Sequence, residues 1–417
     1  MNRSWVALSA CLCLATGCAA NPDGAPALGS DAGPTEETST DSPLPIDTGI
    51  NEATAVCIDG DAAVVISPNQ DWDHDGWSIE QGDCNDCDPN ANPGAFDVAG
   101  NALDEDCNGI ADDEVELCDE GVELSVNEPE MAARVLGLCR FTQANPSTPQ
   151  KRTWGVISAA WQLADQTSGM HYASRGALAD FGPHVHAQQG AALLALSTGT
   201  ARRPGDPAYE APEDSNMGTT CTTPQGWPKD SPSCPEPGST SPVANDSATL
   251  ALRIRVPTNA RSFSFRFAFF TAEFPAWVCK QYNDFFVALL DSKAVSPKAQ
   301  DGNICFDTLG NPISVNSAFL EACAPQVAGG RPFGCALGTE PLVGNGFAAS
   351  PEEPRGHAAT GWLQTTAAVE PGEEIELRLV IWDGGDHLRT STVLIDAFRW
   401  DAKPATEPVT VPVDQPK

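Results

Sequence analysis

About half of the 57 carboxylates of this chain are concentrated in one stretch that contains no lysine or arginine. The stretch begins after Arg3 and ends at Arg134, and His74 is the one histidine in it. Mutual repulsion opposes the compaction of such a segment. We therefore expect it to be either disordered or folded around bound cations.

The overall charge argues against two classes of partner. The 417 residues carry a formal net charge of −34. Nucleic acids are bound through Lys and Arg contacts to phosphate, so no nucleic-acid partner is expected. Docking on anionic lipid needs a basic face and is not expected either. The 36 glycines and 35 prolines are typical of a loop-rich β protein.

The N-terminus reads as an export signal. Arg3 precedes an apolar run, residues 5–15, which is too short to span a bilayer. The run leads into LATGC (14–18), which resembles a bacterial lipobox and implies that Cys18 is lipidated. Ala19 after the cysteine favours delivery to the outer membrane or cell surface, with the lipid as the membrane anchor. The alternative is ordinary secretory cleavage close to Ala19.

Changes in composition divide the chain into five predicted segments. Residues 1–18 are the signal peptide, 19–52 a disordered acidic tether rich in Pro, Ser and Thr, 53–120 an acidic metal-binding segment, 121–402 a β domain, and 403–417 a disordered Pro-rich tail.

The cysteines indicate disulfides. Of the fifteen, Cys11 and Cys13 leave with the signal peptide and Cys18 is the lipidation site, so twelve remain. They form two groups of six: Cys57, Cys84, Cys87, Cys107, Cys118 and Cys139, then Cys221, Cys234, Cys279, Cys305, Cys323 and Cys335. An even number in an exported chain predicts that all twelve are paired, in an order the sequence leaves open. Zinc at Cys84 and Cys87 is a weaker alternative, because the neighbouring ligands are hard carboxylates.

The acidic segment opens with the first half of an EF-hand loop. Asp71, Asp73 and Asp75 alternate before a glycine, so their carboxylates converge, and the Trp77 carbonyl is a further ligand. The Glu expected at position twelve is replaced by Gly, with Asp83 one step later. We therefore predict a calcium site made by these five residues, without the EF-hand's helices.

A second loop repeats the spacing. The predicted ligands of this second ion are Asp104, Asp106, Asn108, the Ile110 carbonyl and Asp112. Asp88, between the two loops, is predicted to bridge them or to complete either shell. An oxygen-only ligand set of this density is typical of Ca²⁺, and we expect one to three ions.

Residues 71–114 resemble a short metal-binding motif that is common in secreted proteins of myxobacteria. The matching elements are the Asp-x-Asp-x-Asp-Gly opening, GDC (82–84), DP (88–89), NPGA (92–95) and the second loop with its cysteine, D-x-DCNG (104–109). The motif is of the copper-binding surface-protein type. Copper does not carry over, because His74 is the one imidazole in the segment.

The remainder of the chain shows the period of half-buried β-strands. Apolar residues alternate with polar or small ones over 250–256, 263–269 and 375–381. Long loops rich in Gly, Pro and Cys separate these runs. The pattern predicts a mainly β protein, an antiparallel β-sandwich of jelly-roll type, preceded by a small calcium-stabilised, disulfide-rich loop segment.

This region resembles the choice-of-anchor L domain of bacterial surface proteins. The resemblance is carried by FFTAEFP (269–275), YNDFF (282–286), DGGD (383–386) and VLID (393–396). It implies a surface-displayed domain that binds or adheres without catalysis. The residues carried over as ligand-binding are Glu273, Asn283, Asp284, Asp383 and Asp386.

No catalytic signature of nucleophile, base and oxyanion donors is recognisable in the sequence. We therefore expect a non-enzymatic surface protein whose partner is an extracellular glycan, matrix component or protein. The alternative is a secreted hydrolase of polysaccharides, in which Glu273, Asp284 or Asp383 would supply a carboxylate pair and the acidic segment would be an accessory.

Overall fold

The computed structural model describes residues 56–59, 62–113, 115–148, 151–234, 241–294, 299, 301–351 and 354–413. All of them belong to one compact unit, Glu52–Lys417. The predicted signal peptide, Cys18 and the tether 19–52 lie outside the described residues. Among the described residues, no helix has the length and apolar character needed to cross a membrane.

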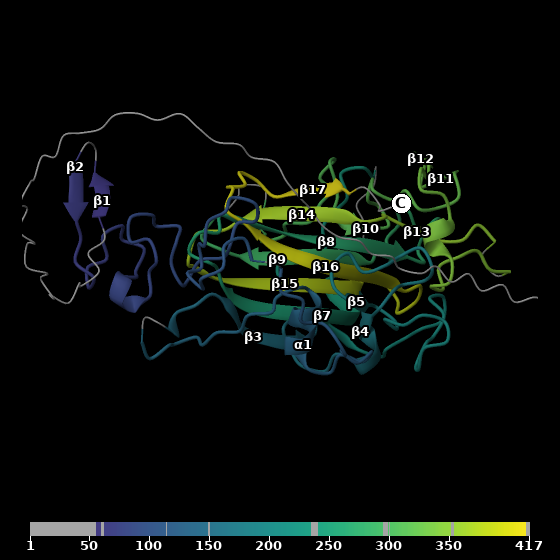
Figure 1. Cartoon of the computed structure of the whole chain (residues 1–417). Coiled ribbons are helices and arrows are strands. Elements are labelled where there is room, and N and C mark those ends of the chain that lie inside the picture. Colours follow the sequence, from purple (N-terminus) through teal and green to yellow (C-terminus); the bar gives the residue numbers. More distant parts are fainter. Residues whose placement is uncertain are drawn as a thin grey trace, which may run out of the picture. The chain divides into compact units, whose positions relative to one another are not determined.

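Two antiparallel sheets form the body of the protein (Figure 1). The first has the order β10-β9-β15-β7-β3, with β6 also paired to β7. Its strands are β3 (Gly155–Gln162), β6 (Thr220–Thr222), β7 (Val243–Arg255), β9 (Phe285–Asp291), β10 (Ile313–Ser314) and β15 (Glu374–Asp383).

The second sheet has the order β17-β14-β8-β16-β5-β4, with β13 also paired to β8. Its strands are β4 (Arg175–Leu178), β5 (Leu193–Ser197), β8 (Ser262–Thr271), β13 (Ala358–Ala359), β14 (Leu363–Ala368), β16 (Ser391–Asp401) and β17 (Val409–Pro412). The small elements outside both sheets are β1 (Val56–Asp59), β2 (Ala62–Val65), β11 (Gln326–Ala328), β12 (Arg331–Phe333), helix α1 (Pro129–Val135) and the 3₁₀ turns Ile79–Gln81, Tyr172–Ser174 and Glu340–Leu342.

The alternating residues predicted as strands make the core between the sheets. Phe263, Phe265, Phe267 and Phe269 of β8 are all fully buried and face apolar residues of β7 and β15. Phe267 meets Phe286 of the other sheet with their ring centroids 5.1 Å apart. Burying each such ring contributes roughly 1.5–3 kcal/mol. The mainly β, antiparallel sandwich is confirmed.

Loops cover the outer faces of both sheets. Trp227, Phe285 and Trp382 pack together over the first sheet, and Phe181, Phe270 and Phe347 do so over the second. This explains why β15 and β16 contain runs that are buried on both sides, where strict alternation fails.

The tail was predicted to be disordered from residue 403, and this prediction is wrong for its described part. β17 pairs antiparallel with β14, and the hydroxyls of Thr365 and Thr410 lie 2.8 Å apart. Val409 and Val411 point outward and Thr410 inward. β14 would otherwise expose an unpaired sheet edge, which the tail closes.

Five disulfides form among the described residues, so the prediction that all twelve cysteines pair is wrong for two of them. The pairs are Cys57–Cys87, Cys84–Cys107, Cys118–Cys139, Cys234–Cys279 and Cys323–Cys335. Cys305 lies in the core between the sheets, whereas Cys221 packs with the aromatic cluster on the outer face of the first sheet. The two thiols lie on opposite faces of the first sheet, so they cannot form a disulfide with each other. Zinc at Cys84 and Cys87 is wrong, because each is in a disulfide.

Candidate metal site

The first acidic loop folds back on itself through its own carboxylates. Asp71 accepts a hydrogen bond from the Gly76 amide at 3.0 Å, Asp73 from the Asp75 amide at 3.2 Å, and Asp75 from the Trp77 amide at 2.8 Å. Gly76 has φ +100°, which side-chain-bearing residues rarely adopt. The loop thus has the tight turn that the sequence predicts.

Two further carboxylates reach this loop from residues 83–86. Asp83 accepts from the Asn85 amide at 2.8 Å, and Asp86 accepts from the Trp72 amide at 2.7 Å. The disulfides from Cys84 and Cys87 fix the intervening chain. Asp86 therefore belongs to the cluster, although its spacing gave no EF-hand signal.

Each of these five aspartates has one carboxylate oxygen that is buried and has no hydrogen-bond partner among the described residues. The five are Oδ1 of Asp71 and Oδ2 of Asp73, Asp75, Asp83 and Asp86. Ligand atoms from Asp71, Asp73 and Asp86 lie within 4.8 Å of one another, as do those from Asp73, Asp75 and Asp83. Burying unpaired carboxylates is costly unless a cation compensates them. This cluster could hold a metal ion.

The electrostatics of the cluster have the same implication. Burial raises the pKa of Asp75 to about 7 and that of Asp83 to about 6, and it also raises the pKa of Asp73. Repulsion from neighbouring aspartates adds to each increase. A bound cation would oppose both effects, because it favours the ionised carboxylates.

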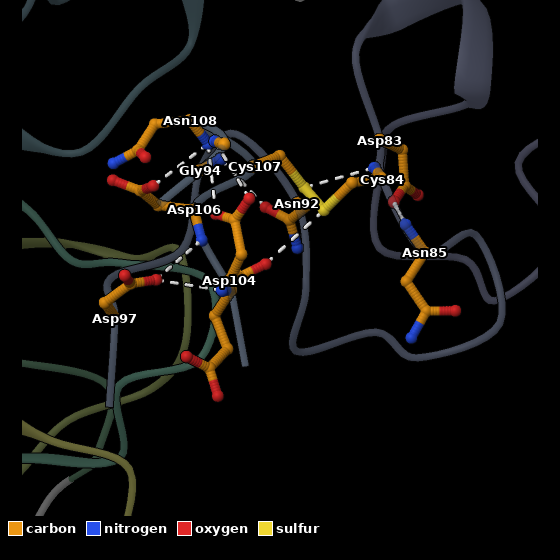
Figure 2. Close-up of a disulfide and its surroundings, with 12 residues drawn as sticks. Asp83, Cys84, Asn85, Asn92, Gly94, Asp97, Asp104, Asp106, Cys107 and Asn108 are labelled. Atoms are coloured by element: carbon orange, nitrogen blue, oxygen red, sulfur yellow. Dashed lines mark hydrogen bonds between the residues drawn. A yellow bond between two sulfur atoms is a disulfide. The ribbon is translucent and has the colours of Figure 1, made fainter. Parts of the chain in front are cut away.

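The second acidic loop, which includes Asp104, Asp106 and Asn108 (Figure 2), has backbone hydrogen bonds at the same spacing as the first. Asp104 accepts from the Gly109 amide at 2.9 Å, Asp106 from the Asn108 amide at 3.2 Å, and Asn108 from the Ile110 amide at 2.8 Å. Gly109 has φ +94°, close to that of its counterpart in the first loop. The repeat read from the sequence is therefore also a repeat in conformation.

The oxygens of the second loop are satisfied by protein donors. The second Asp106 oxygen lies 2.7 Å from the Arg140 guanidinium. Asp112 accepts from the amides of residues 100–102 instead of turning toward the loop. Asp106 lies within 4.8 Å of Asp97 and Asp113, neither of which was predicted. This second group could also hold a metal ion, but Arg140 already supplies it with a positive charge.

Asp88 joins neither group of carboxylates. Its Oδ1 accepts from the backbone and side-chain nitrogens of Asn90 at 3.1 and 2.8 Å. It still contributes to the repulsion that raises the pKa of Asp73. The carbonyls of Trp77 and Ile110 remain predicted ligands.

The acidic segment is bonded directly to the sandwich. The Thr258 amide donates to the Gly94 carbonyl at 2.9 Å, and the Thr258 hydroxyl donates to Asn92 at 2.8 Å. The Trp154 indole donates to the Ala95 carbonyl at 2.6 Å. The NPGA sequence singled out above is thus the junction between the two parts.

The ligand-binding residues inferred by resemblance gather where β8 and β15 end and β9 begins. Glu273, Asp284 and Asp383 are buried, and Glu273 accepts from the Asp284 amide at 2.9 Å. Burial raises the pKa of Glu273 to about 8 and that of Asp383 to about 7, and it raises the pKa of Asp284 as well. Oδ1 of Asp284 and Oδ1 of Asn283 have no partner among the described residues.

Comparison with known proteins decides the family. The profile of the choice-of-anchor L domain matches residues 165–399, more than half of the chain. The chain belongs to the choice-of-anchor L family. No curated protein and no solved structure matches it. The family is not an enzyme family, and its domain is associated with surface or exported proteins.

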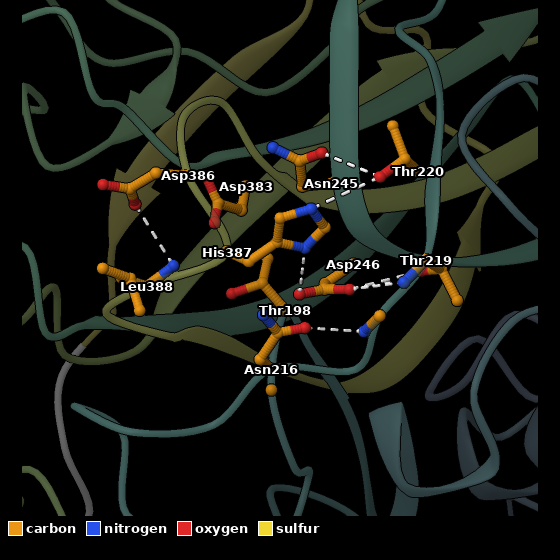
Figure 3. Close-up of polar contacts among 12 residues, drawn as sticks. Thr198, Asn216, Thr219, Thr220, Asn245, Asp246, Asp383, Asp386, His387 and Leu388 are labelled. Carbon is orange, nitrogen blue, oxygen red and sulfur yellow. Dashed lines mark hydrogen bonds and ion pairs between the residues drawn. The ribbon is translucent and has the colours of Figure 1, made fainter.

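Within the choice-of-anchor L domain, a chain of polar groups that the sequence did not predict lies beside Asp383 (Figure 3). His387 contacts Asp246 through Nδ1 at 2.8 Å and Thr220 through Nε2 at 3.3 Å. Thr220 donates to Asn245, its partner on β7. These four side chains come from three distant segments, so no local motif could have predicted their contact.

Asp386 differs from the other residues of the inferred ligand set in the choice-of-anchor L domain. It is exposed and accepts from the Leu388 amide at 3.2 Å. Glu273 and Asp284 are 2% and 0% exposed. A glycosidase pair must reach its substrate, whereas Glu273 and Asp284 both lie below the surface in this structure.

Proposed function

We propose that this protein is a calcium-binding surface lipoprotein whose choice-of-anchor L domain is a non-catalytic binding or adhesion module. One observation supports the calcium site above all others: five aspartates, in two groups that share Asp73, each bury one carboxylate oxygen that has no hydrogen-bond partner among the described residues. Lipidation at Cys18 and the tether 19–52 would place the folded unit away from the outer membrane.

The chemistry of the first cluster favours calcium over other metals. Its ligands are carboxylate oxygens, and Ca²⁺ takes six to eight oxygens in a flexible geometry. The nearby cysteines are in disulfides, and His74 is exposed. Zinc and copper prefer thiolate or imidazole, and Mg²⁺ demands a stricter octahedron with several waters.

The ion would supply part of the folding energy of the segment. The disulfides and the junction at residues 92–95 position the aspartates, but they leave five like charges facing one another. A cation that binds only the folded form stabilises it by about 2.7 kcal/mol at a hundred times its Kd. Proteins displayed outside the cell meet calcium at concentrations that fill sites of this kind.

Calcium titration by calorimetry tests the proposal. We expect the full chain to bind Ca²⁺, and Asp73→Asn to reduce the affinity at least about tenfold, or 1.4 kcal/mol, because Asp73 belongs to both groups of ligands. Asp88→Asn is the matched control, since Asp88 lies in the same segment outside both groups. Absence of binding heat, or equal losses in both variants, would refute the site.

A further inference from the structure

A groove separates the acidic segment from the edge of the sandwich. Its volume is about 750 Å³. His74, Asp75 and Trp77 line it from the acidic segment, and Trp154, Arg152 and Arg261 line it from the sandwich. The hydrogen bonds of Thr258 and Trp154 hold the two walls together. The groove is therefore a fixed feature of the junction.

The charge of this groove is opposite to that of the chain. Three arginines line it, and Asp75 is the one carboxylate among its described lining residues. The whole chain carries −34. A positive lining on so acidic a protein favours an anionic ligand, because the arginines supply local attraction that the rest of the surface lacks.

The arginines have different roles. Arg255 is 4% exposed and bonds Glu374 at 2.9 Å and four acceptors in residues 142–153. It therefore fixes the loop that forms one wall. Arg152 and Arg261 are exposed, and within the described part of the chain neither guanidinium has a hydrogen-bond or ion-pair partner. These two are available to a ligand.

The other lining groups indicate what kind of anion fits. Trp154 is half-buried and lines the groove, and the Arg140 guanidinium carbon lies over its ring, 4.7 Å from the ring centroid. Ser147, Thr148 and Asn90 add neutral donors and acceptors. Arginine binds carboxylates through two parallel hydrogen bonds, and aromatic rings pack against apolar faces. A chain of carboxylated sugars offers carboxylates, hydroxyls and apolar ring faces together.

We propose that this groove binds a uronic-acid-containing polysaccharide through Arg152, Arg261 and Trp154. The inference deepens the proposed binding function and rests on it. Asp75 and Trp77 belong both to the groove wall and to the calcium loop. Binding of the glycan therefore depends on calcium, because the ion holds this wall in place and neutralises the carboxylates behind it.

Calorimetry with tetragalacturonate, which is too short to gel with calcium, tests the inference on the calcium-loaded full chain. We expect binding, a loss of about tenfold or more in affinity in the double variant Arg152→Ala/Arg261→Ala, and no change in Arg399→Ala, an exposed arginine on β16 outside the groove. Chelation of calcium should weaken binding as well.

Three results would overturn the inference: no binding of tetragalacturonate, an unchanged affinity in the double variant, or equal affinity for a neutral tetrasaccharide or for tetraglutamate. Equal binding of tetraglutamate would show a general anion site instead of a sugar site. Calcium titration of the same samples separates the two proposals. If calcium binds normally and the saccharide does not, only the groove proposal fails.

Discussion

At the scale of single residues, the two acidic loops differ in whether their carboxylate oxygens have protein partners. Their backbone hydrogen bonds match, yet the first leaves its buried oxygens unpaired and the second pairs Asp106 with Arg140. The sequence predicted both loops from their spacing. It could not predict Arg140, because an ion pair across more than thirty residues of sequence is set by the fold.

Arg140→Gln tests this difference. The substitution leaves Asp106 beside Asp97 and Asp113 without a positive charge, so we expect the second loop to bind a cation. Calcium titration should then show two sites per chain where the unaltered protein shows one. A stoichiometry that stays at one would mean that Arg140 does not take the place of an ion.

The buried carboxyls of the choice-of-anchor L domain predict a pH dependence. Glu273 has its pKa raised from 4.5 to about 8 in the folded protein. The folded state then holds a proton that the unfolded state has lost, so the free energy of unfolding falls as pH rises from about 4.5 to 8. One such group changes it by at most about 1.4 kcal/mol per pH unit.

Glu273→Gln keeps the acceptor for the Asp284 amide but does not titrate. We expect urea unfolding at fixed calcium to show a weaker loss of stability between pH 5 and 8 in this variant than in the unaltered protein. Parallel pH profiles for the two proteins would show that Glu273 is ionised in the fold.

At the scale of elements, strands with a regular apolar period were predictable and short, context-dependent ones were not. The alternating phenylalanines of β8 are visible in the sequence, so this strand could be predicted. β17 is four residues in a Pro-rich tail, and it forms because β14 offers an open edge. Cysteine pairing likewise depends on which sheet face each residue occupies. The even number of cysteines therefore led to a wrong prediction of disulfides for Cys221 and Cys305.

Thiol labelling checks the disulfide framework. We expect the unreduced, denatured mature protein to show two free thiols, those of Cys221 and Cys305. In the native protein Cys305 should resist labelling, because it is fully buried and burial raises its pKa to about 12. No free thiol under denaturing conditions would indicate a sixth disulfide, and four or more would contradict the framework.

At the scale of the whole molecule, the sequence predicted the β fold and the acidic cluster but not how they are joined. The junction at Thr258 and Trp154 and the groove beside it depend on residues that are distant in the chain.

The lipid anchor is a prediction at this scale. Cys18→Ser should move the protein from the membrane fraction to the soluble fraction, and retention in the membrane would place the anchor elsewhere.

The central claim is that calcium orders the acidic segment. Hydrogen–deuterium exchange measured by mass spectrometry on the full chain, with and without calcium, tests it most directly. We predict that calcium slows exchange in peptides covering residues 71–86, while peptides from β7 and β8 stay unchanged, and that Asp73→Asn reduces this protection at the same calcium concentration. Equal exchange of residues 71–86 in both conditions would contradict the account.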